Sequence, residues 1–107
     1  MILVNLISNA KYAVDGLPAE ARRVTIRLEP PAGDRIRLEV RDTGIGIAPE
    51  MLTQIFQYGF TTREGGHGFG LHSSALAAQD LGGSLTAHSE GPGRGATFIL
   101  ELPYTPA

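Results

Sequence analysis

The spacing of hydrophobic residues switches between a helical and a strand-like pattern along this chain, and the order of the switches restricts the fold more than any other feature. Apolar residues recur every three or four positions in two segments, 1–15 and 71–81, which predicts two amphipathic helices. They alternate with polar residues in further segments, and we predict strands at 24–29, 35–42, 84–89 and 96–102. This order indicates an α+β fold, a two-layer sandwich with both helices on one face of the sheet.

Length and composition are those of one globular domain spanning 1–107. The chain has 107 residues, of which 42% are hydrophobic and 19% charged, and this balance excludes disordered, coiled-coil and collagen-like chains. Cysteine is absent, which excludes disulfides and thiolate metal sites. The net charge of -2 offers no basic footprint for nucleic acid or for an anionic membrane.

The sequence was also searched for membrane spans, for a leader and for the start of its first helix. No apolar stretch is long enough for a membrane span, and the N-terminus has no basic leader, so we expect a cytoplasmic domain without direct membrane contact, any anchor lying elsewhere in the parent protein. The sequence begins inside an apolar-periodic segment without a capping residue. We therefore expect a piece of a longer protein.

Two asparagines in the first predicted helix are candidate metal ligands. Asn5 and Asn9 are four positions apart and share one helix face. Asparagine is a poor helix former, so two of them within a helix indicate a function. Amide oxygens suit Mg²⁺, which also takes water and phosphate oxygens. The alternative is that both side chains simply face water.

An acidic residue ends the second predicted strand and is followed by two glycines. Asp42 has the parity of the apolar positions of its strand, so its side chain should face the covered side of the sheet, where a carboxylate needs hydrogen-bond donors. Gly44 and Gly46 would let a flat ligand approach the backbone beside it, and the amino group of a purine would satisfy the carboxylate. The alternative is a turn capped by Asp42.

The long segment 43–69 is a candidate lid, and it ends in a glycine-rich stretch. Residues 65–70 lead directly into the second predicted helix, where free backbone N–H groups and the helix dipole favour an anion. Arg63 lies just ahead and could reach a phosphate. A mobile linker or a solvated arginine would look similar.

Other common signatures are missing. The chain has no G-x-x-x-x-G-K-[ST] loop, and a dinucleotide fingerprint after the second strand would need a glycine where Pro49 stands. His67, His72 and His88 lack the spacing of a zinc site, and no G-x-S-x-G nucleophile motif occurs.

Taken together and in order, five motifs resemble the ATP-binding domain of sensor histidine kinases, the Bergerat fold shared with gyrase, a heat-shock chaperone and the mismatch-repair MutL proteins. The motifs are Asn5 to Ala10, Asp42 to Ile47, Phe56 with Phe60, Gly66 to Leu71, and Gly93 to Phe98. The resemblance covers essentially the whole chain. It implies a mixed, mainly antiparallel sheet, whose usual first strand, with the upstream dimerisation domain, we expect to lie outside this sequence.

The resemblance also implies roles for individual residues. Asn9, helped by Asn5, would ligate Mg²⁺, Asp42 would bind the adenine amino group, and Phe56 and Phe60 would pack the lid. Nucleotide contacts are implied for Asn5, Asn9, Tyr12, Asp42, Gly44, Gly46, Ile47, Arg63, Gly66, His67, Gly68, Phe69, Gly70, Leu71 and Thr97.

Two of these positions depart from the family pattern. Relatives carry a basic residue close behind the second asparagine, where Lys11 and Tyr12 stand, so either could meet a phosphate. Relatives also carry a hydroxyl directly after the last glycine, where this chain has Ala96 followed by Thr97. These last two residues should face opposite sides of the sheet.

The implied activity is transfer of the γ-phosphoryl group of Mg-ATP to a histidine on a separate helical domain of the same protein, with a response regulator as a further partner and a homodimeric parent. His67, His72 and His88 are followed by Gly, Ser and Ser rather than by an acidic residue, so none has the pattern of the phosphoacceptor. We therefore expect the isolated domain to bind nucleotide and to be nearly inert.

Three alternatives remain open. The chain could be another superfamily member, such as an anti-sigma serine kinase or an ATPase, or a binding module that never transfers phosphate. A retroviral-type aspartic protease would share the triplet Asp42-Thr43-Gly44, but the two predicted helices and the glycine-rich segment argue against it.

Overall fold

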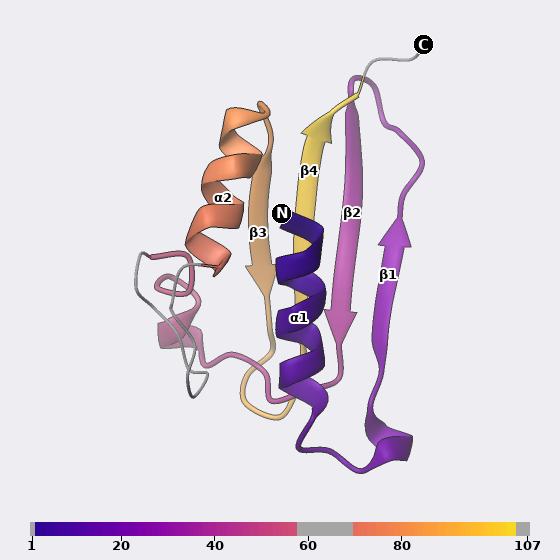
Figure 1. The fold of residues 1–107 in the computed structure, drawn as a ribbon, viewed down its shortest axis with the longest axis vertical. Coiled ribbons are helices and arrows are strands. Elements are labelled where there is room, and N and C mark those ends of the chain that lie inside the picture. Colours follow the sequence, from indigo (N-terminus) through magenta and orange to yellow (C-terminus); the bar gives the residue numbers. More distant parts are fainter. Residues whose placement is uncertain (1, 58–69, 105–107) are drawn as a thin grey trace.

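The computed structural model describes residues 2–57 and 70–104, which form two helices packed on one face of a four-stranded sheet (Figure 1). This confirms the α+β sandwich predicted from the hydrophobic spacing. The helices are α1 (Ile2–Val14) and α2 (Gly70–Asp80), and the strands are β1 (Val24–Leu28), β2 (Arg35–Asp42), β3 (Ser84–His88) and β4 (Ala96–Pro103). Short 3-10 helices occupy Ala19–Ala21 and Pro49–Met51.

The sheet is built from two hairpins joined through their second strands. Its strand order is β1-β2-β4-β3, and its three pairings are all antiparallel, where the family resemblance implied a mixed sheet. The pairing of β2 with β4 sets Val40 opposite Phe98 and Asp42 opposite Ala96. The last residue of β2 therefore lies beside the first residue of β4.

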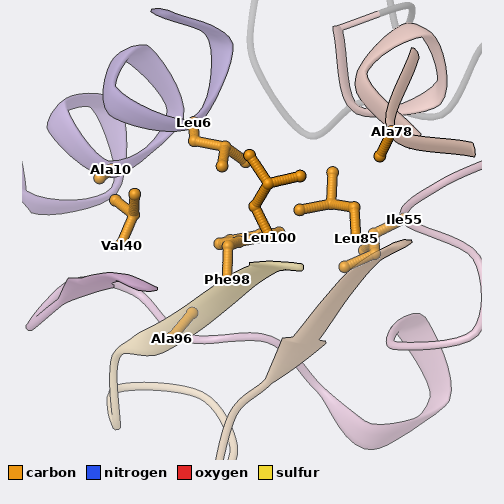
Figure 2. Close-up of a cluster of buried hydrophobic side chains, with 9 residues drawn as sticks. All are labelled: Leu6, Ala10, Val40, Ile55, Ala78, Leu85, Ala96, Phe98 and Leu100. Carbon is orange, nitrogen blue, oxygen red and sulfur yellow. The ribbon is translucent and has the colours of Figure 1, made fainter. Parts of the chain in front are cut away.

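The core fills the space between the helices and the sheet (Figure 2). It takes alternate residues from the strands and residues three or four apart from the helices, which is the pattern that the sequence predicts. Its buried members are Leu6, Ala10, Val40, Ile55, Ala78, Leu85, Ala96, Phe98 and Leu100. Phe56, half-buried, meets Phe98 edge to face, with ring centroids 6.4 Å apart.

Helix α2 ends in the glycine pair that the sequence indicated. Gly82 has a φ of 83°, and the amide of Gly83 donates to the carbonyl of Ala78 at 2.8 Å. A left-handed glycine with this returning hydrogen bond closes a helix. The chain then turns directly into β3.

Strand β1 differs from the prediction of a strand with one covered face. Its apolar residues Val24, Ile26 and Leu28 are 38%, 49% and 62% exposed. The reason is their position, because β1 is an edge strand and α1 lies over β2 and β4 (Figure 1). Alternation identified the strand but could not reveal which strands the helices cover.

Candidate functional site

Asp42 lies where the sequence placed it, at the end of β2 with its side chain on the helix-covered face. It is 4% exposed, and its Oδ1 accepts a hydrogen bond of 2.8 Å from the amide of Gly44. Burial raises the pKa of the Asp42 carboxyl, and hydrogen bonds from the backbone of Gly44 and Ala96 partly oppose that rise. A buried carboxylate of this kind is a strong acceptor that can recognise a ligand donor.

The segment Gly44–Ile47 runs from Asp42 along the end of α1. The amide of Ile45 donates to the carbonyl of Ala13 at 3.0 Å, and a Cβ on Gly44 would overlap that same carbonyl. Gly46 has a φ of 73°, and a Cβ there would overlap the carbonyl oxygen of Gly91. The two glycines are therefore needed for contacts within the protein, in addition to the ligand approach inferred from the sequence.

The loop between β3 and β4 is bound to this segment by hydrogen bonds. The amide of Gly93 donates to the carbonyl of Ile45 at 2.7 Å, and the amide of Gly95 donates to the carbonyl of Gly44 at 3.2 Å. The hydroxyl of Ser89 accepts from the amide of Ile47 at 3.0 Å. Sequence reasoning missed Ser89, because a single serine after a strand has no signature that separates it from an ordinary turn residue.

One face of α1 carries Asn5, Asn9 and Tyr12, all half-buried. Asn5 donates from Nδ2 to the hydroxyl of Ser74 in α2 at 3.0 Å, so this face is turned toward α2. Lys11 is exposed and lies off this face. Of the two residues left open by the sequence, Tyr12 is the one that the structure groups with the asparagines.

The first turn of α2 contains Gly70 and Leu71, and it is linked to the segment that follows the 3-10 helix Pro49–Met51. The Nδ1 atom of His72 lies 3.1 Å from the carbonyl oxygen of Phe56, within hydrogen-bond distance. The remaining predicted residues of the lid and the glycine-rich stretch lie outside the described residues. They are Phe60, Arg63, Gly66, His67, Gly68 and Phe69.

The structure does not bring Thr97 to this site. Thr97 lies opposite Arg41 in the pairing of β2 with β4, and its hydroxyl accepts from Arg41 Nε at 3.3 Å on the face of the sheet away from the helices. Asp42 and Ala96, each one residue along, face the helices. The structure therefore separates Thr97 from the other candidate residues, and its nucleotide contact stays a prediction.

The grouped residues supply the parts that a purine nucleotide requires. Asp42 offers an acceptor for a base, the asparagine face of α1 offers amide oxygens, and the start of α2 offers backbone N–H groups. Within residues 2–57 and 70–104 no three His, Asp or Glu side chains gather as a metal site. A divalent ion held by the asparagines would thus complete its shell with water or phosphate oxygens, as Mg²⁺ does.

Comparison with known proteins gives one family over nearly the whole chain. Residues 1–106 match the family described as histidine kinase-, DNA gyrase B- and HSP90-like ATPase. The two-component sensor PprA of Pseudomonas aeruginosa is 42% identical over an alignment of 107 positions, which covers 95% of this chain and 11% of PprA. The sensor protein FixL of Bradyrhizobium diazoefficiens is 38% identical over 102 residues, 95% of this chain and 20% of FixL.

Solved structures share the fold. The mycobacterial sensor histidine kinase MprB superposes with a TM-score of 0.84 at 26% identity, covering 99% of this chain and 70% of that one. Full-length ShkA in complex with AMPPNP gives a TM-score of 0.84 at 32% identity, covering 99% of this chain and 21% of that one. The chain therefore spans a small part of several longer relatives.

In the described part of the chain, no helix has the length and hydrophobicity needed to cross a membrane.

Proposed function

The chain belongs to the family of histidine kinase-, DNA gyrase B- and HSP90-like ATPases, as an ATP-binding catalytic domain of the two-component sensor kinase type. We propose that two of its residues, Asp42 and Asn9, recognise Mg-ATP. ATP binding in this fold is supported by ShkA, whose structure is a complex with the ATP analogue AMPPNP. The relatives are sensor proteins many times longer than this chain. The roles of single residues below rest on the geometry of this chain.

Asp42 recognises the adenine base. The observation that carries this proposal is an acid group 4% exposed on the helix-covered face, with a pKa raised by burial. The Asp42 carboxylate accepts hydrogen bonds from backbone amides, but a carboxylate has about four lone pairs. It can therefore also accept a hydrogen bond from the exocyclic amino group of adenine. Gly44, Gly46 and Ile47 form the adjoining wall.

Asn9 and Asn5 present amide oxygens toward the phosphates from the rigid backbone of α1. The donor set fits Mg²⁺, because amide oxygens are hard ligands and the described residues add no cluster of carboxylates or imidazoles that would favour another metal. When bound, Mg²⁺ supplies neutralisation of the charge on the phosphates. Tyr12 and the first turn of α2 complete the phosphate side of the site.

The reaction proposed for the parent protein is in-line phosphoryl transfer. A ring nitrogen of a histidine on a separate helical domain attacks the γ-phosphorus, the bond to the bridging oxygen breaks, and ADP leaves with the electron pair. This chain contributes orientation and charge neutralisation, while the acceptor domain supplies the nucleophile. The phosphoryl group would pass on to a response regulator. Because ATP is the donor, the domain would act in the cytoplasm.

Calorimetric titration tests the proposal. The chain is titrated with ATP and with GTP, each with and without Mg²⁺, and we expect ATP to bind more tightly and Mg²⁺ to strengthen binding. Asp42→Ala should abolish ATP binding, and Asn9→Ala should remove mainly the part of the affinity that depends on Mg²⁺. Matched controls are Asp80→Asn and Gln79→Ala, which alter exposed side chains at the end of α2. Equal ATP binding by wild type and Asp42→Ala would refute the proposal.

A further inference from the structure

Ser89, directly after β3, lies within hydrogen-bond distance of four backbone groups. Its Oγ lies 2.7 Å from the carbonyl oxygen of Gly95 and 3.3 Å from that of Gly91. It also accepts from the amides of Ile47 at 3.0 Å and Gly91 at 3.2 Å. The side chain is half-buried, so water competes only partly for these partners.

The chemistry of a hydroxyl matches this arrangement. A serine has one hydrogen to donate and two lone pairs that accept. The shorter contact, to Gly95, takes the hydrogen, and the amides of Ile47 and Gly91 take the lone pairs. All the hydrogen-bonding capacity of Ser89 is thus used on backbone groups.

These bonds reach both sides of Asp42. Ile47 ends the segment that follows Asp42 in sequence, and Gly95 precedes Ala96, which lies opposite Asp42 in the sheet. Ser89 therefore fixes the segment Gly44–Ile47 relative to the strand end that carries the carboxylate.

We propose that Ser89 is a positioning residue for base recognition: its hydroxyl sets the wall Gly44–Ile47 at the distance from Asp42 that an adenine ring needs. This inference rests on the proposed role of Asp42. It adds that selectivity for adenine depends on a residue that touches neither the base nor the phosphates. Without the hydroxyl, the wall can shift, and the fit between the carboxylate and the amino group of the base loosens.

The test compares ATP with inosine triphosphate, which carries an oxygen in place of the amino group of adenine. The quantity measured is the ratio of the Kd for inosine triphosphate to the Kd for ATP. Since a variant that is partly unfolded weakens both nucleotides equally, this ratio reports on base recognition and not on stability. The variants are Ser89→Ala, Ser89→Thr, which keeps the hydroxyl, and Ser84→Ala, an exposed control at the start of β3.

We expect Ser89→Ala to lower the ratio about fivefold, the factor that matches the loss of one hydrogen bond. Ser89→Thr should restore most of the ratio, and Ser84→Ala should leave it unchanged. If Ser89→Ala does not fold, Ser89→Cys, whose thiol bonds more weakly, should lower the ratio in the same direction.

The outcomes separate the two proposals. A wild-type chain that binds both nucleotides equally would refute the role of Asp42 and with it the proposed base site. A wild type that prefers ATP, combined with an unchanged ratio in Ser89→Ala or with a ratio that Ser89→Thr fails to restore, would overturn the role of Ser89 alone.

Discussion

Asn5 donates a hydrogen bond of 3.0 Å from Nδ2 to the hydroxyl of Ser74, joining α1 to α2 across 69 positions of sequence. Ser74 is 2% exposed, so this bond lies at the buried boundary between the helices. The sequence suggested a metal ligand in Asn5, and the structure adds a second role for its amide group. The nitrogen ties the two helices together, and the oxygen belongs to the face shared with Asn9.

Removing the hydroxyl of Ser74 should destabilise the fold. Ser74→Ala leaves the half-buried Asn5 amide nitrogen without this acceptor, and we expect the free energy of unfolding to fall by about 1 kcal/mol. Urea denaturation measures the change. Ser73→Ala, at an exposed neighbouring position, is the control. Equal midpoints for the two variants would show that the bond contributes nothing.

The pH dependence of stability should reveal the burial of Asp42. The pKa of Asp42 in the folded chain lies above the ordinary value of 3.8. Its contribution to the free energy of unfolding is therefore fully present below pH 3.8, where the carboxyl is protonated, and is lost as pH rises through the folded pKa. The stability of wild type relative to Asp42→Asn should therefore decline as pH rises from below 3.8 through the folded pKa of Asp42.

Urea denaturation at several pH values measures this decline, and Asp80→Asn gives the reference for removing one exposed negative charge. A difference between wild type and Asp42→Asn that stays constant with pH would contradict the buried environment of the carboxyl. If the wild type instead becomes more stable relative to Asp42→Asn as pH rises, the pKa of Asp42 is lowered in the folded chain and not raised.

Two glycines allow backbone strain to be separated from steric overlap. Gly33 and Gly46 have φ values of 63° and 73°, but a Cβ meets open space at Gly33 and overlaps the carbonyl of Gly91 at Gly46. Gly33→Ala should cost about 1 kcal/mol of unfolding free energy for the left-handed conformation, and Gly46→Ala should cost more than about 2 kcal/mol. Thermal and urea unfolding compare them. Similar losses would mean that the loop carrying Gly91 moves aside easily.

Phe56 should connect the segment after Pro49–Met51 to the core. Phe56→Ala removes its edge-to-face contact with Phe98, and because Phe56 is half-buried we expect a loss of about 2 kcal/mol in unfolding free energy. Phe56→Leu keeps much of the apolar volume and should lose about half as much. If the two variants unfold at the same urea concentration, the ring contact makes no specific contribution.

The elements of the fold could be predicted because each depends on local spacing. The helix over 1–15 and the strand ending at Asp42 follow from periodicity, and they agree with α1 and β2. The pairing of β2 with β4 and the exposure of β1 could not be predicted, since both depend on which distant segments meet. The same reason explains why Thr97, read from motif position, lies on the other face.

The candidate site was predictable where a residue type conflicts with its surroundings. Asp42 among buried positions and Asn5 with Asn9 within a helix are local conflicts that one sequence reveals. Ser89 and Ser74 were missed because their function consists of hydrogen bonds to residues far away in sequence.

A crystal structure of the chain with AMPPNP and Mg²⁺ tests the central claim most directly. We expect the exocyclic amino group of adenine at hydrogen-bond distance from the Asp42 carboxylate, the base against Gly44–Ile47, and the metal on the side-chain oxygen of Asn9. A nucleotide bound elsewhere, or a base whose amino group does not meet Asp42, would contradict the account.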